Sequence, residues 1–301
     1  MTRRLVVTAD DAGLDAARDA AILAAFDHGI VRAASCVANG PTIEAFLAEA
    51  ARRPGLSLGL HVNLTEGTPL AAGRAFTLTE KRGLFLGDKR EVWRRAVAGE
   101  VDSREVERET TAQWRRLRTL GVTPDHVNGH HHVHVLPHVS TGVVWALEAI
   151  GRPVFVRVPR EAAPPAGFPP VGEPDMPLGT ALLSGPRLSL LRAGHAGLVS
   201  LAVHAERLRA GLGRRLRAPD GFFGVAWCTA PSLDLVLHGL SSRPDGIVEA
   251  MVHPGRMATH TTGPSADPRR DLELAVLTDP ATRAAVEATG TVLAGYAELL
   301  E

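Results

Sequence analysis

Cysteine and aromatic residues are scarce in this chain, and neither sign of charge is in excess. The two cysteines, Cys36 and Cys228, lie far apart, which argues against a disulfide framework and favours a reducing compartment. Lysine plus arginine and aspartate plus glutamate number 33 each, so the formal net charge at pH 7 is zero. A chain with this charge balance lacks the strongly basic surface that binds nucleic acids or anionic membranes. We therefore expect no nucleic-acid partner.

Long apolar runs are also missing. The apolar segment near the N-terminus is too short for the core of a signal peptide, and no run reaches the length of a membrane span. We expect a soluble, cytoplasmic protein with no membrane span. Hydrophobic residues make up 45% of the 301 residues and charged residues 22%, which is typical of a globular protein with a sizeable core.

Segments patterned as strands alternate with segments patterned as helices. Apolar, β-branched runs predict strands at 5–9, 30–38, 58–64, 125–129, 154–158 and 246–252. Helical spacing and capping residues predict helices at 15–28, 42–53, 103–120, 137–150, 271–277 and 280–288. This alternation indicates parallel strands joined by helical crossovers. We expect an α/β fold, a distorted or incomplete (β/α) barrel with its active site at the C-terminal ends of the strands.

Proline is concentrated in one part of the chain, since seven of the 21 prolines fall between Pro159 and Pro177. Such a density is incompatible with regular structure and favours a long surface loop or lid over a domain boundary. We predict a single domain over residues 1–301, with a proline-rich loop or insert around 159–220.

Polar residues occupy the ends of several predicted strands. Asp10 and Asp11 follow the first strand, His61 lies within the third, and His130 and His253 follow two later ones. In β/α barrels these strand ends meet at one edge, where active sites are built. Singly, each residue has a plainer interpretation: Asp11 could cap a helix, His61 could be a hydrogen-bonded core histidine, and His253 could be a turn residue. These separate interpretations do not explain the shared position at strand ends.

A carboxylate with two imidazoles is typical of divalent-metal sites that keep positions open for water and substrate. Of two adjacent carboxylates, one could bind the metal while the other accepts a proton, and a cation would reduce the repulsion between them. On an extended chain His130, His132 and His134 would share one face, and His131 would lie on the other. The sequence leaves open which of these histidines reaches a metal.

Four stretches carry a family resemblance: TADDAGL at 8–14, GLHVNLT at 59–65, HVNGHHHVH at 126–134 and MVHPG at 251–255. In order and spacing they resemble the YdjC-like carbohydrate deacetylases, the family that includes chitooligosaccharide deacetylase. The resemblance extends from the N-terminus to about residue 160 and resumes near 222–224. The chain departs from the family pattern at Ala12, where an aromatic residue is usual, and at Asn128-Gly129, where Asp-Ser is usual. An amide orients a metal-bound imidazole less strongly than a carboxylate does.

The resemblance implies one divalent ion, magnesium by family association, bound by Asp11, His61 and His130. It also implies Asp10 as the base and an N-acetylated sugar or oligosaccharide as the substrate. Arg157, in the matching segment 157–161, is expected to bind substrate. Two nitrogen ligands suit zinc or another transition metal at least as well as magnesium. A homodimer is one possible assembly.

These expectations combine into a metal-dependent hydrolase that removes acetyl groups from N-acetylated sugars. The ion would polarise the acetamide carbonyl and activate water, Asp10 would accept the proton of that water, and His253 would protonate the leaving amine. Two alternatives remain: a metal-dependent phosphoesterase, and a non-catalytic protein that binds metal or sugar.

Overall fold

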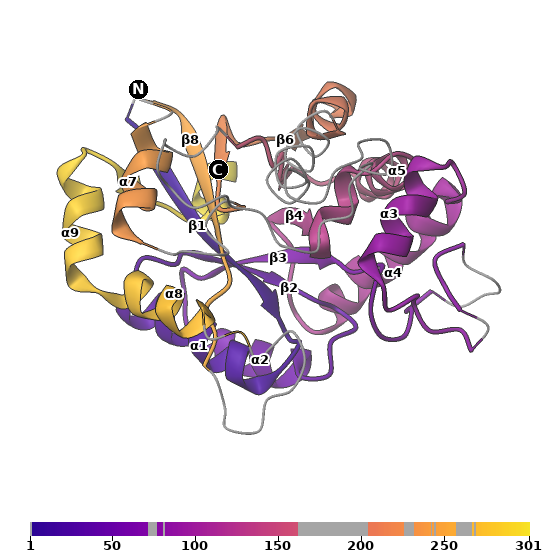
Figure 1. Cartoon of the computed structure of the whole chain (residues 1–301), viewed down its shortest axis with the longest axis horizontal. Helices are drawn as coiled ribbons and strands as arrows, with labels where there is room; N and C mark the ends of the chain where they lie inside the picture. Colours follow the sequence, from indigo (N-terminus) through magenta and orange to yellow (C-terminus); the bar gives the residue numbers. More distant parts are fainter. Residues whose placement is uncertain are drawn as a thin grey trace, which may run out of the picture.

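The computed structural model describes residues 2–71, 77–80, 82–161, 204–225, 232–241, 243, 245–256, 267 and 269–301. Its core is a sheet with the strand order β6-β5-β4-β3-β2-β1-β8-β7, and a ninth strand, β9, pairs with β1 (Figure 1). Every paired strand is parallel to its neighbour. The strands are β1 (Arg4–Ala12), β2 (Ala33–Cys36), β3 (Ser57–Val62), β4 (His126–Gly129), β5 (Val154–Val156), β6 (Leu216–Arg217), β7 (Gly221–Phe223), β8 (Ile247–Val252) and β9 (Val292–Leu293).

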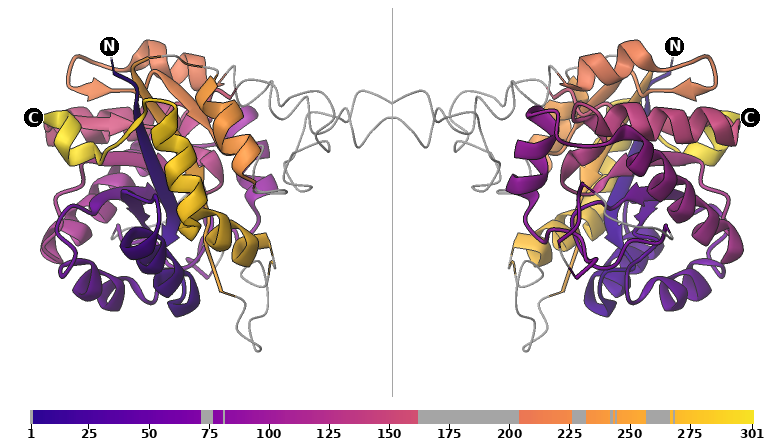
Figure 2. Two further views of the ribbon diagram at one scale, coloured as in Figure 1. Left: turned by 90° about the vertical axis from the view of Figure 1, so that its left-hand side faces the viewer. Right: turned by 90° about the vertical axis from the view of Figure 1, so that its right-hand side faces the viewer.

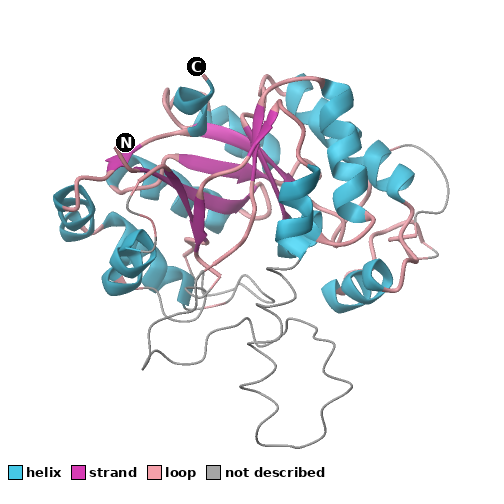
Figure 3. Ribbon diagram, turned by 90° about the horizontal axis from the view of Figure 1, so that it is seen from above, coloured by secondary structure: helices cyan, strands magenta, loops and turns pink. Residues whose placement is uncertain are grey.

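Helices lie around the outside of the strands (Figures 2 and 3). They are α1 (Ala16–His28), α2 (Ile43–Ala50), α3 (Lys89–Val97), α4 (Ser103–Thr119), the 3-10 helix η1 (His130–Val135), α5 (Val139–Ile150), α7 (Leu233–Ser241), α8 (Arg269–Thr278), α9 (Pro280–Ala288) and α10 (Tyr296–Leu300). Helix α1 begins after Asp15, whose carboxylate accepts hydrogen bonds from the backbone N–H groups of Ala17 and Arg18. Helix α4 packs closely with α5 and turns Val106, Trp114 and Leu117 inward, at the spacing of one helical face.

The sheet curls until its two edges almost meet. In a flat sheet of eight strands in this order, β6 and β7 would lie about 34 Å apart, because neighbouring strands lie about 4.8 Å apart. Only residues 218–220 join these two strands, and such a link spans at most about 15 Å. β6 and β7 therefore act as one interrupted strand, whose first part pairs with β5 and whose second part pairs with β8. This arrangement confirms the predicted distorted (β/α) barrel.

The C-terminal segment fills the end of the barrel at which the strands begin. β9 pairs with the first residues of β1, and α10 follows it directly. The ring of Tyr296 is buried there, 4.5 Å from the ring of His126 and 5.1 Å from that of Phe155. Because this end is filled, the opposite end, where the strands terminate, is the one left for a functional site.

All six predicted strands and all six predicted helices have counterparts in the structure, although β2 is shorter than the predicted strand at 30–38. Most of the proline-rich range 159–220 lies outside the described residues, as does Cys228. The described end of that range contains a helix at 204–211 and the barrel strand β6. None of the described helices has both the length and the apolar character needed to cross a bilayer.

Candidate functional site

Asp10 and Asp11 lie on a bulge at the C-terminal end of β1. Between two consecutive pairings with β2, β1 advances by three residues and β2 by only two. The φ angle of Asp11 is 72°, in the left-handed region, which costs a residue with a Cβ atom about 1–2 kcal/mol. Neighbours on a regular strand point to opposite faces, and a bulge changes this direction locally. The side chains of both aspartates are therefore buried against residues of the other barrel strands.

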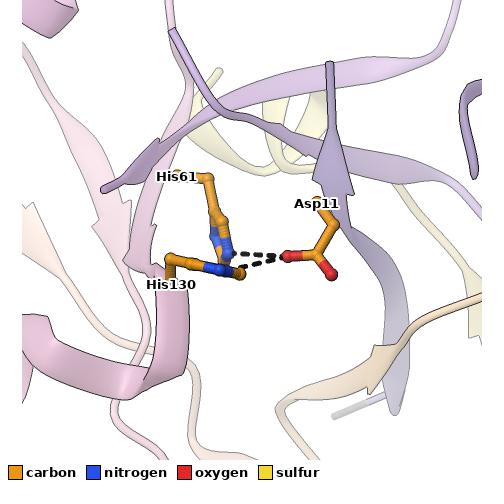
Figure 4. Close-up of side chains that lie close together, drawn as sticks. All are labelled: Asp11, His61 and His130. Atoms are coloured by element: carbon orange, nitrogen blue, oxygen red, sulfur yellow. Dashed lines mark ion pairs between the residues drawn. The ribbon is translucent and has the colours of Figure 1, made fainter. Parts of the chain in front are cut away.

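The side chains of Asp11, His61 and His130 converge on one point (Figure 4). Asp11 Oδ1 lies 3.0 Å from His130 Nδ1 and 3.4 Å from His61 Nε2. The three ligand atoms lie within 4.8 Å of one another, and all three residues are buried. The structure thus brings together, from β1, β3 and the start of η1, the three residues that the family resemblance assigns to a metal.

Asn128 of β4 determines which nitrogen of His61 carries the proton. Its amide Nδ2 donates a hydrogen bond to Asp10 Oδ1 over 3.0 Å, so its carbonyl Oδ1 faces His61. That oxygen lies 2.6 Å from His61 Nδ1 and can only accept, which requires a proton on Nδ1. In the neutral ring, His61 Nε2 then carries the lone pair, on the side that faces Asp11 Oδ1. Histidines that bind metals commonly donate their second N–H group in this way.

The donor set fits a divalent cation. Asp11 Oδ1 is buried without a hydrogen-bond partner, and it faces the lone pair of His61 Nε2. Two ligand atoms about 2.1 Å from a shared ion lie about 3.0 Å apart at a right angle and about 3.4 Å apart at a tetrahedral angle. The observed separations of 3.0 and 3.4 Å match these values. A cation bound between these atoms would satisfy the buried Asp11 Oδ1.

The second oxygen of Asp11 is paired with two arginines that the sequence analysis did not identify. Oδ2 lies 2.8 Å from Arg18 Nη1 and 3.4 Å from Arg270 Nη2. Burial opposes ionisation of Asp11, but His130 and Arg18 outweigh it and hold the pKa of Asp11 well below its usual value. Burial likewise lowers the pKa of His130, but Asp11 and Glu66 outweigh it and raise that pKa to about 9. The pocket thus attracts positive charge.

Asp10 belongs to an ion-pair network inside the barrel. Both of its oxygens contact the guanidinium of Arg157, with Nη2 2.9 Å from Oδ1 and Nη1 against Oδ2. Arg157 also donates from Nε to Glu249 Oε1 over 2.9 Å. Burial opposes ionisation of Asp10, but Arg157, together with His61 and His253, outweighs it and lowers the pKa of Asp10. Asp10 is therefore held as a carboxylate beside the Asp11 pocket.

The side chain of Arg157 is only 1% exposed, and its guanidinium is enclosed by Asp10 and Glu249. Its substrate-binding role stays a prediction, and its contacts favour a role in holding Asp10. A carboxylate has about four lone-pair directions. Arg157 and Asn128 use three of those on Asp10, which leaves one acceptor direction on Oδ2.

The histidine run is not extended, so its residues do not alternate between two faces. His131 and His132 have φ angles of 53° and 56°, and the chain turns tightly through η1. As a result the ring of His131 lies beside that of His130, with centroids 3.9 Å apart, whereas His132 packs on Phe222. The expected grouping of His130, His132 and His134 against His131 is wrong, because two successive left-handed residues break the alternation.

His253 and Glu66 lie at the edge of the site. His253 directly follows β8, whose register with β1 sets it beside Asp10. Glu66, on the loop after β3, has its Oε1 3.7 Å from His130 Nε2. Glu66, His130 and His131 form a second group of potential ligands, within 4.8 Å of one another. Glu66 and Arg270 carry no local sequence signal, whereas Arg18 lies on the helix that follows Asp11 closely.

Comparisons with known proteins agree with this architecture. A solved structure from Enterococcus faecalis V583, described provisionally as a cellobiose-phosphate cleavage protein, superposes with a TM-score of 0.72 at 21% identity and covers 99% of each chain. That likeness shows a shared fold. The chain is also 36% identical over 320 residues to carbohydrate deacetylase of Homo sapiens, covering 98% of this chain and 91% of that protein.

A second relative is chitooligosaccharide deacetylase of Serratia marcescens, which is 37% identical over 164 residues, covering 54% of this chain and 62% of that protein. The family described as YdjC-like protein matches residues 4–288, which include the bulge of β1, the histidine run and the end of β8. The chain therefore belongs to the YdjC-like family.

Proposed function

We propose that this chain is a metal-dependent hydrolase that removes acetyl groups from N-acetylated sugars. The observation that carries the proposal is the buried, unpartnered Asp11 Oδ1 facing His61 Nε2 and His130 Nδ1, with the Asp10 carboxylate on the same bulge. The relatives named carbohydrate deacetylase and chitooligosaccharide deacetylase support the reaction and the class of substrate.

Asp11, His61 and His130 would hold the divalent ion. When bound, the ion would supply positive charge that polarises the acetamide carbonyl and makes an adjacent water more acidic. Magnesium is expected from the family, whereas two imidazole ligands favour zinc or another transition metal. A metal-reconstitution series of the stripped protein would identify the ion.

Asp10 is the proposed general base. Arg157 keeps it ionised, and one acceptor direction of its Oδ2 is left to receive a proton from attacking water. Asn128 contacts both Asp10 and His61, which fixes the base relative to the metal ligand. Holding both groups in one geometry favours the attack, because reactants that are positioned in advance lose less freedom in the transition state.

The reaction can be tested by measuring acetate release from N-acetylglucosamine oligomers with and without a chelator. We expect release by the metal-loaded protein, its loss on chelation and its return when a divalent ion is added back, because in the proposed reaction the ion polarises the acetamide carbonyl. Phosphate release from phosphate esters without acetate release would favour the phosphoesterase alternative. Tight metal or sugar binding with no product would indicate a non-catalytic protein.

His253 is the proposed acid for the leaving amine, because it lies at the strand end beside Asp10. We expect His253→Ala to lower turnover by about 10²-fold or more, since an amine leaves poorly without a proton. The metal content measured by elemental analysis should stay that of the wild type. Wild-type turnover in this variant would remove His253 from the mechanism. A cytoplasmic location and a homodimer also stay predictions.

A further inference from the structure

A chain of polar side chains connects Asp125, directly before β4, with the metal pocket. Asp125 Oδ1 lies 2.6 Å from His126 Nδ1, and His126 Nε2 lies 3.1 Å from Ser35 Oγ. Asn128 Nδ2 lies 2.7 Å from the same Ser35 Oγ, and Asn128 Oδ1 contacts His61. His126, Ser35 and Asn128 are at most 2% exposed, and the side chain of Asp125 is 12% exposed. The chain thus connects a partly exposed carboxylate to a buried metal ligand.

The directions of the hydrogen bonds in this chain follow from the contact of Asn128 with Asp10, whose two oxygens both face the guanidinium of Arg157. A carboxylate only accepts, so Asn128 must direct its NH2 group to Asp10. The second proton of that group points to Ser35 Oγ, which therefore accepts one hydrogen bond. The hydroxyl proton of Ser35 is then free to be donated to His126 Nε2. With a neutral His126 ring, this arrangement of protons satisfies all of these contacts.

The tautomer of His126 is determined in the same way. Its Nε2 accepts from Ser35, so its proton is on Nδ1 and is donated to the Asp125 carboxylate. A carboxylate in this position stabilises that tautomer, because it can accept the Nδ1 proton and has none to donate. Asp125 thereby favours the acceptor state of His126, which in turn orients the hydroxyl of Ser35.

The surrounding residues restrict the position of the His126 ring. One face stacks on Tyr296, with ring centroids 4.5 Å apart. On the neighbouring strand, Gly59 is paired in register with Ser35, and a Cβ atom at Gly59 would come within 2.3 Å of His126 Nε2. The absence of a side chain at Gly59 therefore creates the space in which His126 reaches Ser35.

We propose that Asp125, His126 and Ser35 are positioning residues that, through Asn128, hold metal ligand His61 with its Nδ1 protonated and its Nε2 free. This inference rests on the metal site of the proposed function. None of the three residues touches the ligand atoms of the pocket. They act by keeping Asn128 in the one orientation that serves both Asp10 and His61. Outer partners of this kind orient the ligands and raise their affinity for the ion.

The test uses Ser35→Ala, which removes the middle of the chain, and Asp125→Asn, which keeps the shape and removes the charge. We expect Ser35→Ala to raise the dissociation constant for Zn²⁺ by about tenfold. This is the lower end of the effects seen when a residue that hydrogen-bonds to a metal ligand is replaced. Asp125→Asn should raise the dissociation constant less. Ser57→Ala is the matched control, because Ser57 is also a buried barrel serine that accepts one backbone hydrogen bond, from Ala297. Its affinity should stay within about twofold of the wild type, since Ser57 does not contact the chain to His61.

The second readout is the proton position on His61 and His126, measured by NMR on metal-free protein with isotope-labelled histidine. We expect a single tautomer for each ring in the wild type, protonated on Nδ1, and a mixture in both variants. Wild-type spectra and wild-type affinity in Ser35→Ala would overturn the proposal. If that variant does not fold, the same two results in Asp125→Asn would overturn it. A protein that binds Zn²⁺ normally but releases no acetate would contradict the proposed function and leave this inference standing.

Discussion

Asp10→Asn is expected to lower the turnover number by about 10³-fold, within the range of 10²- to 10⁴-fold that general acid–base groups contribute. The amide has nearly the same shape as the carboxylate, but it cannot accept a proton from water at neutral pH. Its NH2 group would also face either Arg157 or Asn128, both of which donate to Asp10 in the wild type. The variant therefore loses the base and part of its alignment.

The measurement is steady-state acetate release together with metal content. Because Asp10 is not among the three converging ligands, the stoichiometry of the bound ion should not change, and the loss should appear in kcat more than in KM. Asp279→Asn is a matched control. Asp279 caps α9 through the N–H of Ala281, and asparagine caps a helix about as well as aspartate. Wild-type kcat in Asp10→Asn would show that another group is the base.

Arg157→Met is expected to lower the free energy of unfolding by about 3–5 kcal/mol, the range found when one partner of a buried ion pair is removed. The guanidinium of Arg157 is enclosed by the carboxylates of Asp10 and Glu249, each at most 2% exposed as a side chain. Methionine fills much of the volume but leaves two buried negative charges without their partner. Equilibrium unfolding in urea, followed by circular dichroism, measures the change.

Arg53→Met provides the comparison at the surface. Arg53 also makes a two-point ion pair, with Asp27, but its side chain is 22% exposed and that of Asp27 is 32% exposed. Water and salt screen such a pair, so its loss should cost less than about 1 kcal/mol. Equal effects of the two substitutions would contradict the view that burial makes the Arg157 network important.

The barrel is predictable from the sequence because the signals that indicate it are local. Apolar runs of strand length alternate with helical patterns, and each such pattern depends on side chains a few residues apart. The strands β6 and β7 carry no such signal, because they are only two and three residues long and form strands by pairing with the two edges of the sheet. The same holds for β9 and α10, whose positions are set by contacts at the base of the barrel.

The candidate site, like the fold, is only partly predictable from the sequence. Asp11, His61 and His130 could be named from the sequence because parallel strands deliver their C-terminal residues to one edge, and because their motifs carry a family resemblance. The turn at His131 and His132 was not foreseen, since two left-handed non-glycine residues in succession are rare and have no simple sequence pattern.

By itself, then, the sequence determined an α/β barrel with a carboxylate pair and imidazoles at the ends of its strands. Only the tertiary structure decided that Arg157 would hold Asp10, that Arg18 and Arg270 would share Asp11, and that Asn128 would connect Asp10 with His61. Asn128 lies 118 residues from Asp10 and 67 from His61. Charge pairing depends on distance in space, and no local pattern in a chain records which distant side chains will meet when it folds.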